Sequence, residues 1–234
     1  DNEKNLYSEK IINLPNIWNC HSLINYEVVI KELPYYKNNY FTFGSFNNST
    51  KISEEVIKVW SEILLKTKNS KLLLKAVSKD AKIAYPNFLE KFKYYKIDES
   101  RVIFLPGTEK REDHYKLYNE IDLSLDTFPY PGVTTSFESV WMGVPFLTMK
   151  GNNFTSRCGE SININLDMKE FIAENFDDYI NKAVSLSNSL EKLSNFRKLL
   201  RSKAINSPLF NMKEFGKNFS NIINDIWNRY SSNN

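Results

Sequence analysis

The stretch LSLDTFPYPGVTTSFESVWMGVPFLTM (residues 123–149) contains two short apolar runs separated by a turn and a helical segment. The first run, Leu123–Asp126, and the last, Pro145–Met149, are predicted strands. Between them, the apolar residues of 137–141 recur with the period of a helix. Neighbouring parallel strands need a helix-sized return, so this stretch predicts one strand, helix, strand unit of a parallel sheet.

The same alternation extends outward from this unit. Upstream, runs rich in β-branched and aromatic residues predict strands at 40–46, 71–77 and 102–106, with segments of helical period between them. Together they predict an α/β protein with a Rossmann-like, doubly wound parallel sheet from about residue 40 to about residue 175. Beyond it the pattern turns fully helical and ends in a helix with a continuous apolar stripe, Phe215–Tyr230.

The composition excludes several classes of protein. Basic residues number 31 and acidic residues 28, without a block of like charge, so no nucleic-acid partner is indicated. No apolar run approaches the ~20 residues needed to cross a bilayer, so no membrane partner is predicted. Cys20 and Cys158 fit no metal or redox spacing, which favours reduced thiols in a cytoplasmic protein. The chain begins without methionine or a signal-peptide pattern, so we expect it to be a piece of a longer protein.

Ligands of doubly wound sheets bind outside the carboxyl ends of the strands, so the loops that follow strands are the candidate sites. In the loop at 44–51, Lys51 precedes a helix that Ser53 could cap, where its ammonium would meet a phosphate drawn to the helix N-terminus. After the loop at 106–111, His114 shares a helix face with apolar residues and so points toward the sheet or the crevice at its edge, not into bulk water. The alternative for Lys51 is a solvated lysine beside a helix cap. The alternative for His114 is a buried histidine with a satisfied hydrogen bond and no ligand.

The third loop, 126–138, is the strongest candidate. Two prolines and Gly132 predict a rigid turn, after which Thr134-Thr135-Ser136 opens a helix whose free N–H groups and hydroxyls would form a phosphate cradle. Glu138, one turn into that helix, is placed to bond ribose hydroxyls. The alternative is a capping box, because Thr135 and Glu138 have the S/T-x-x-E spacing.

Two common nucleotide motifs, G-x-G-x-x-G and G-x-x-x-x-G-K-[ST], are absent from the sequence, as is any cluster of His, Cys and carboxylates at metal spacing. The predicted ligand is therefore a nucleoside diphosphate held by a helix N-terminus and a lysine, with no cofactor and no obligatory metal.

Residues 134–149 closely resemble the donor-binding segment of the O-linked N-acetylglucosamine transferase and Spindly family of glycosyltransferases, including its bacterial members. Further segments resemble this family in the right order: 7–15, 46–52, 101–104 with the residues that follow, and 206–211. The resemblance covers nearly the whole chain and implies the C-terminal lobe of a GT-B fold. The implied domains are a remnant of the preceding lobe (1–39), a nucleotide-sugar-binding lobe (40–205) and a C-terminal helix that packs back toward the other lobe (206–234).

The resemblance also implies roles for single residues. Lys51 would contact the diphosphate and stabilise it as the leaving group. Thr134 and Thr135 would hold phosphate, and Glu138 would contact ribose. Asn48 stands where the family has glutamine, one methylene longer.

The family's lysine after the third strand matches Lys110, with Arg111 as the alternative, and its following histidine matches His114. Animal members have histidine where this chain has Val133, which removes one candidate phosphate donor.

The implied activity is that of an inverting, metal-independent protein O-glycosyltransferase that uses UDP-N-acetylglucosamine and modifies Ser or Thr of an acceptor protein. The alternatives are GDP-fucose or UDP-glucose as donor, or a non-catalytic α/β binding or scaffold module. The implied partners within the parent chain are an N-terminal catalytic lobe and tetratricopeptide repeats. Without them, we expect this chain to bind nucleotide sugar at most weakly, to transfer sugar poorly and to self-associate through its last helix.

Overall fold

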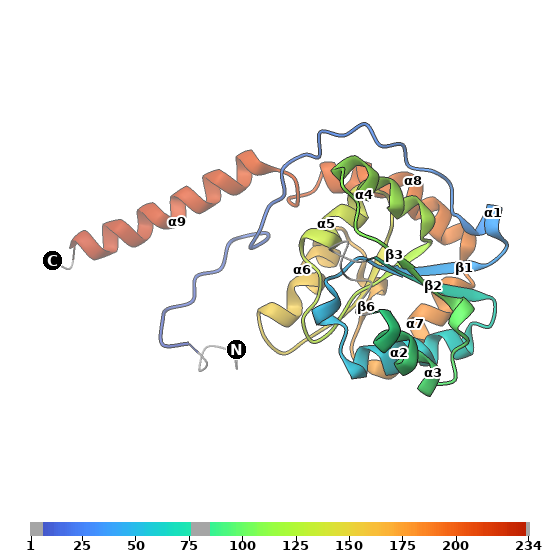
Figure 1. Cartoon of the computed structure of the whole chain (residues 1–234). Helices are drawn as coiled ribbons and strands as arrows, with labels where there is room; N and C mark the ends of the chain where they lie inside the picture. The colour runs from blue at the N-terminus through green and yellow to red at the C-terminus, as the bar shows by residue number, and fades with distance from the viewer. Residues whose placement is uncertain (1–6, 76–84, 233–234) are drawn as a thin grey trace.

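The computed structural model describes residues 7–75 and 85–232, and within them it contains one six-stranded sheet with helices on both faces (Figure 1). The strand order is β3-β2-β1-β4-β5-β6, and every neighbouring pair is parallel. The strands are β1 (Phe41–Ser45), β2 (Ser70–Lys75), β3 (Val102–Leu105), β4 (Leu123–Leu125), β5 (Phe146–Met149) and β6 (Ile172–Ala173). The predicted Rossmann-like, doubly wound sheet is confirmed.

The first five strands coincide with the predicted ones within a residue or two. The predicted strand at 71–77 is found as β2, and its last two residues lie outside the described residues. β6 was not predicted, because a strand of two residues is too short to show an alternation.

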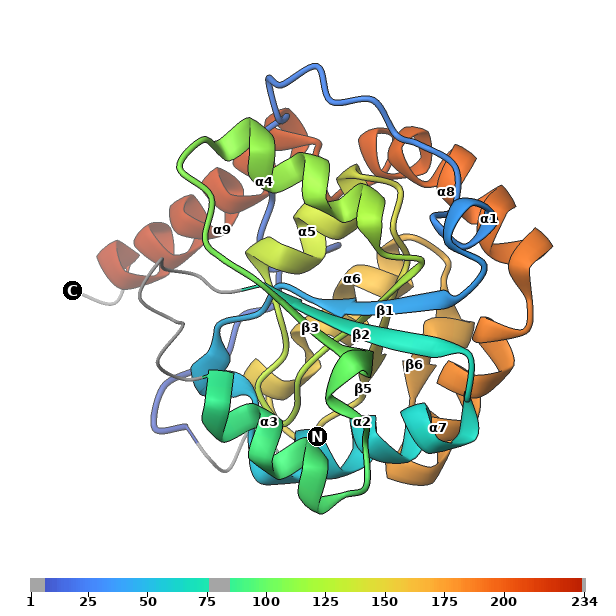
Figure 2. The same ribbon diagram turned by 45° about the vertical axis from the view of Figure 1, so that its right-hand side comes forward.

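Two layers of α-helices cover the two faces of the sheet (Figure 2). One layer holds α2 (Glu54–Lys66), α3 (Tyr85–Tyr94) and α7 (Phe176–Ser187), and the other holds α4 (Arg111–Leu117), α5 (Thr134–Trp141) and α8 (Leu190–Ile205). The remaining helices are α1 (Tyr35–Asn38), α6 (Cys158–Asn165) and α9 (Met212–Ser232), with short 3-10 helices η2 (Ser49–Lys51), η4 (Glu99–Arg101), η5 (Tyr118–Glu120), η6 (Thr155–Arg157) and η7 (Lys169–Phe171).

Helix α2 shows why these segments fold as they do. The Ser53 hydroxyl accepts a hydrogen bond from the Val56 N–H at 3.3 Å, which confirms the predicted cap. Val56, Trp60 and Ile63 then repeat on one face and are fully buried, where α2 packs against α7. The amphipathic face therefore fixes the orientation of the loop that precedes the helix.

The N-terminal segment before β1 runs over the layer that contains α4 and α8, and two arginines of α8 anchor it. The buried Arg197 donates to the carbonyl oxygen of Lys31, and Arg201 donates to that of Val28. The side chains of Val28 and Leu33 are buried in the core of the sheet domain. The part of 1–39 near its C-terminal end thus contributes to this lobe.

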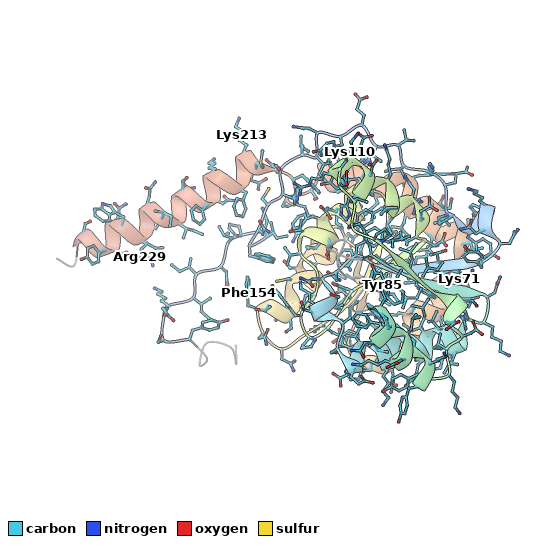
Figure 3. The ribbon with its side chains drawn as sticks, viewed as in Figure 1. Lys71, Tyr85, Lys110, Phe154, Lys213 and Arg229 are labelled. Carbon is cyan, nitrogen blue, oxygen red and sulfur yellow. The ribbon has the colours of Figure 1, made fainter. Side chains whose placement is uncertain are left out.

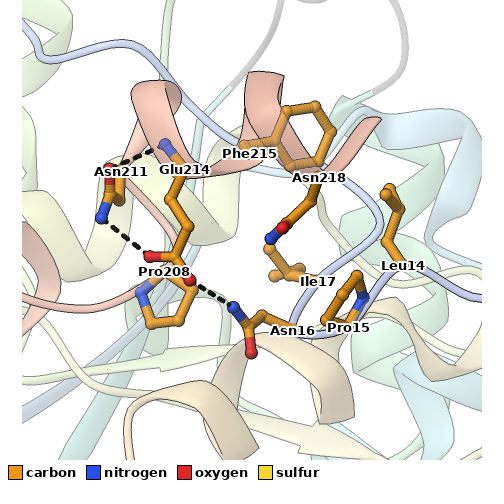
Figure 4. A pocket seen from close by; sticks show the side chains of 9 residues that line it. All are labelled: Leu14, Pro15, Asn16, Ile17, Pro208, Asn211, Glu214, Phe215 and Asn218. Carbon is orange, nitrogen blue, oxygen red and sulfur yellow. Dashed lines mark hydrogen bonds between the residues drawn. The ribbon is translucent and has the colours of Figure 1, made fainter. Parts of the chain in front are cut away.

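Helix α9 leaves the globular part and carries its side chains into open space along most of its length (Figures 1 and 3). Its first turns contact residues 14–17 at a seam that encloses about 10 Å³, room for a single water (Figure 4). There the Asn16 amide donates to Glu214, which also accepts from Asn211. Among the described residues, no helix combines the length and the apolar character that crossing a membrane requires.

Candidate functional site

The strand order reverses between β1 and β4, which are parallel neighbours at the centre of the sheet. In doubly wound sheets, the carboxyl ends of the strands at such a switch point mark the place where ligands bind. β1 leads into the loop that carries Lys51, and β4 leads into the loop that begins at Asp126 and opens α5. The structure therefore brings the first and third predicted loops together at this edge of the sheet.

Asp126 is the centre of a buried hydrogen-bond network in the loop after β4. Its carboxylate accepts four hydrogen bonds of 2.6–3.0 Å, from the N–H groups of Gly132 and Thr127, the Asn47 amide and the Thr148 hydroxyl. Burial raises the pKa of Asp126 to about 6, although these donors favour the ionised form. The network ties the loop to β5 and to the loop after β1.

The first turn of α5 is open at its N-terminal end. Val133 precedes the helix and has no side-chain acceptor, and the first intrahelical bonds run from the N–H groups of Ser136 and Phe137 to the Val133 carbonyl. The amides of Thr134 and Thr135 come before these bonds and belong to the helix end that attracts anions. Thr134 is exposed and Thr135 is half-buried.

Among the described residues, the capping box that the spacing of Thr135 and Glu138 allows does not form. The Thr135 hydroxyl instead donates to Asn47 Oδ1 at 2.8 Å. The Glu138 carboxylate faces His114 and Tyr118. Neither side chain satisfies the helix end, because tertiary partners compete successfully for both.

Lys51 reaches from the β1 loop to the β4 loop. It is the last residue of η2, and its Nζ donates to the Pro131 carbonyl at 2.9 Å and lies 3.8 Å from the centroid of the Tyr130 ring. Burial lowers the pKa of Lys51, while attraction to Asp126 raises it. The predicted alternative of a solvated lysine does not describe this half-buried, bonded side chain.

The two asparagines of the first loop have different surroundings. Asn48, the residue singled out from the sequence, is exposed and accepts a hydrogen bond from the Thr50 N–H at 3.1 Å, which caps η2. Asn47 is buried and bridges Asp126 and Thr135. Sequence reasoning missed Asn47, although a polar side chain directly after a buried strand is a signal that could have found it.

A second polar cluster joins α4 to α5. His114 Nε2 lies 2.8 Å from Glu138 Oε2, and the Tyr118 hydroxyl lies 3.2 Å from the same oxygen. Glu138 is 4% exposed, so its partners replace water almost completely. His114 Nδ1 is buried and has no hydrogen-bond partner among the described residues.

Lys110 and Arg111, the two candidates for the family lysine, have different surroundings. Lys110 precedes α4 as an exposed residue whose side chain makes no cap (Figure 3). Arg111 is also exposed, but its Nη2 lies 3.9 Å from Glu138 Oε1. The structure thus brings Arg111 to the cluster that holds His114 and Glu138.

Lys75 is a further cation that the sequence reasoning did not single out. It is the last residue of β2, half-buried beside Leu105 of β3 at the carboxyl edge of the sheet. Burial lowers the pKa of Lys75, and attraction to Glu138 opposes this. A lysine that ends the apolar run Leu72-Leu73-Leu74 was the available signal.

Taken over residues 7–75 and 85–232, no three His, Cys, Asp or Glu side chains lie close enough together to hold a metal ion. Cys20 and Cys158 are both free thiols. The charged groups at this edge of the sheet include Lys51, Lys75 and Arg111 as cations and the buried Asp126 and Glu138 as carboxylates.

The chain matches the model of a known protein family. The family model described as glycosyl transferase family 41 matches residues 25–219, which is most of the chain. The chain belongs to glycosyl transferase family 41. Its Rossmann-like sheet is accordingly one lobe of the GT-B type, the fold of its structural neighbours.

Family 41 relatives are found among plant proteins. The chain is 34% identical over 229 residues to a probable UDP-N-acetylglucosamine–peptide N-acetylglucosaminyltransferase SPINDLY of Solanum lycopersicum, covering 98% of this chain and 25% of that protein. The SPINDLY protein of Arabidopsis thaliana is 32% identical, with 95% and 24% covered. The chain thus spans about a quarter of the length of these relatives.

Solved structures agree with this assignment. A mutant O-GlcNAc transferase of Thermobaculum terrenum superimposes with a TM-score of 0.83 at 26% identity, covering 97% of this chain and 43% of that one. TarM of S. aureus, in complex with UDP among other ligands, superimposes with a TM-score of 0.64 at 16% identity, covering 95% and 41%, and shows the shared fold alone.

Proposed function

We propose that this chain is the donor-binding lobe of an inverting protein O-glycosyltransferase that transfers N-acetylglucosamine from UDP-N-acetylglucosamine to Ser or Thr. One observation carries the proposal: the Lys51 ammonium is bonded to the Pro131 carbonyl, just before α5 opens with the free amides of Thr134 and Thr135. A cation and a helix N-terminus at the switch point of a doubly wound sheet form a site for a diphosphate.

The chemistry needs stabilisation of a leaving group. The acceptor hydroxyl oxygen forms a bond to the anomeric carbon while the bond from that carbon to the β-phosphate oxygen breaks, and UDP leaves with the electron pair. Lys51 and the N-terminus of α5 stabilise the negative charge that develops on the diphosphate. The hydroxyl proton passes to a base that this lobe does not supply in our proposal.

The second cluster suits the nucleoside. The buried Glu138, held by His114 and Tyr118, presents acceptor oxygens one turn into α5, where we place the ribose hydroxyls. His114 and Arg111 flank this position, and Lys110 is exposed at the start of α4. Asn48 caps η2, the short helix that ends at Lys51, and in our proposal it contributes by fixing that helix.

The rest of the active site lies outside this chain in our proposal. The relatives are about four times as long, and names given to them include the transfer of N-acetylglucosamine to peptides. We propose that a second lobe binds the acceptor and covers the exposed apolar stripe of α9, and that tetratricopeptide repeats belong to the same parent protein. Transfer by this chain alone is then expected to be slow.

The proposal is tested by titration calorimetry of the complete protein with UDP and with GDP, followed by a transfer assay with labelled UDP-N-acetylglucosamine. UDP is expected to bind at least about tenfold more tightly than GDP, the discrimination expected of a built polar site. Tighter binding of GDP would favour the fucose alternative, and transfer from UDP-glucose alone would favour the glucose one. Binding of neither nucleotide would contradict the proposal and favour a scaffold.

A further inference from the structure

Tyr130 covers the ammonium group of Lys51. Its ring centroid lies 3.8 Å from Lys51 Nζ, well within the ~6 Å over which an aromatic face attracts a cation. The same ammonium donates to the carbonyl of the next residue, Pro131, at 2.9 Å. Two consecutive residues of the β4 loop thus hold one cation of the β1 loop.

The backbone of Tyr130 is itself fixed. Its carbonyl accepts a hydrogen bond from the Thr127 hydroxyl at 2.8 Å. On one side of it, the ring of the buried Phe128 packs against Tyr179 with centroids 5.4 Å apart. On the other side, the Gly132 N–H donates to Asp126 at 2.6 Å. A loop held on both sides fixes the backbone from which the Tyr130 ring reaches Lys51.

Neither group that holds the Lys51 ammonium carries a formal charge. A carboxylate in the place of Tyr130 would neutralise the ammonium and would compete with an incoming diphosphate. The face of an aromatic ring attracts the cation through its quadrupole and leaves the net charge in place. Tyr130 is also 49% exposed, so its ring is not part of the hydrophobic core.

We propose that Tyr130 is the positioning residue of Lys51: its ring holds the ammonium beside the N-terminus of α5, oriented for the diphosphate of the donor. This inference rests on the proposed function, because it assigns a role toward that ligand. The gain is preorganisation, since an otherwise flexible lysine side chain loses its freedom before the ligand arrives.

A double-mutant cycle on the complete protein tests the inference, with UDP affinity measured by calorimetry. Tyr130→Leu is expected to weaken UDP binding about three- to tenfold, the range of a partly desolvated cation–π contact. Tyr130→Phe keeps the aromatic face and is expected to bind UDP like the wild type. When Lys51 is already replaced by Met, adding Tyr130→Leu is expected to weaken UDP binding by less than about twofold. The ring then has no ammonium to hold.

The chain offers a matched control on the opposite side of the sheet. Lys71 Nζ lies 4.6 Å from the centroid of the Tyr40 ring, at the amino ends of the strands (Figure 3). Tyr40→Leu removes the same kind of contact far from the proposed site. UDP affinity of Tyr40→Leu is expected to equal that of the wild type.

A measurement without ligand separates this inference from the proposed function. In protein with carbon-13-labelled lysine, the Lys51 ε-methylene protons are expected to resonate upfield under the Tyr130 ring current, to remain there in Tyr130→Phe and to move to the ordinary range in Tyr130→Leu. An unshifted signal in the wild type overturns the inference. A shifted signal without UDP binding leaves the contact in place but overturns the proposed function, and with it the role of Tyr130 toward the donor.

Three affinity results would also overturn the inference. Equal UDP affinity of Tyr130→Leu and wild type would show that the ring does not matter. If Tyr130→Leu weakens UDP binding as much in Lys51→Met as in the wild type, Tyr130 acts on the ligand or the fold directly. Tighter UDP binding by Tyr130→Leu would show that the ring withholds Lys51 from the ligand.

Discussion

His114 Nε2 lies 2.8 Å from Glu138 Oε2, and this contact joins the start of α4 to the first turns of α5. The two residues lie in helices that follow different strands, β3 and β4, which are not neighbours in the sheet, so they meet only when the sheet is assembled. The same carboxylate oxygen accepts a hydrogen bond from Tyr118 at 3.2 Å. The nearly buried carboxylate of Glu138 therefore joins two helices of the fold and is also part of the candidate site.

The first prediction concerns this pair. Glu138→Ala removes the acceptor of the His114 ring and leaves the Tyr118 hydroxyl with only the Thr135 carbonyl, and it is expected to lower the free energy of unfolding by about 2–4 kcal/mol. His114→Ala is expected to cost less, and the double variant to cost less than the sum of the two, as neighbours in contact do. Urea unfolding of the four proteins measures the coupling. Strict additivity would show that the contact contributes nothing.

The second prediction concerns Gly132. A Cβ at this position would lie 2.5 Å from Thr135 Oγ1 and 2.8 Å from Asn47 Oδ1, the two atoms whose hydrogen bond joins the loops. Gly132→Ala is therefore expected to destabilise the protein by about 1–3 kcal/mol and to weaken UDP binding. Thermal unfolding and calorimetry measure the two effects.

Gly216 in α9 provides the matched control, because a Cβ there would meet nothing within 4 Å. Gly216→Ala is expected to stabilise the helix by about 0.5–1 kcal/mol and to leave UDP affinity unchanged. Equal destabilisation by the two alanine substitutions would refute the close packing that we assign to Gly132.

The third prediction is a pH dependence. Burial raises the pKa of Asp126 from 3.8 to about 6, so the folded protein binds the proton more tightly than the unfolded chain does. The contribution of Asp126 to the free energy of unfolding is then greatest below about pH 4, falls as the pH rises to about 6 and is constant above that. A shift of this size corresponds to about 3 kcal/mol.

Urea unfolding between pH 4 and pH 7 measures this slope in the wild type and in Asp126→Asn, in which the fall with rising pH is expected to be smaller. Asp98 serves as the control, since hydrogen bonds to Ser100 hold the pKa of this exposed carboxyl below its usual value. Asp98→Asn is expected to leave the fall in place. An unchanged slope in Asp126→Asn would argue against a raised pKa.

The fourth prediction concerns α9. Phe219, Ile223, Trp227 and Tyr230 are 48–64% exposed and line one face of the helix. This chain, when prepared by itself, is expected to associate in a concentration-dependent manner, and the double variant Phe219→Ser, Trp227→Ser to sediment as a monomer. Tyr94→Ser, at an isolated residue that is 78% exposed, is the control. A monomeric wild type would show that the stripe does not drive association.

Much of the fold follows from periodicity. The strands β1 to β5 and the amphipathic α2 were predictable because each has an apolar pattern long enough to carry its period. Helix α6 was not predicted, because its buried face includes the polar Asn163, which donates to the carbonyl oxygens of Phe146 and Phe171. Polar side chains that pair with backbone carbonyls in the core leave no hydrophobic signature.

The candidate site was predictable as far as its loops, but not as far as its contacts. The sequence placed Lys51, Thr135 and Glu138 in loops at one edge of the sheet, and the structure brings them there. It could not distinguish Asn47 from Asn48, because side-chain direction in a loop depends on tertiary partners. The contact between the Tyr118 hydroxyl and Glu138 was likewise not predictable. The apolar pattern indicates that the Tyr118 ring is buried, but it does not indicate the partner of its hydroxyl.

The most direct test of the whole account is the UDP affinity of Lys51→Ala, measured by titration calorimetry on the complete protein. We predict binding at least about tenfold weaker than that of the wild type, because a charged hydrogen bond to the diphosphate is lost. Lys71→Ala, which removes a lysine on the opposite side of the sheet, is predicted to bind UDP normally. Wild-type affinity in Lys51→Ala would contradict the assignment of this edge as the diphosphate site.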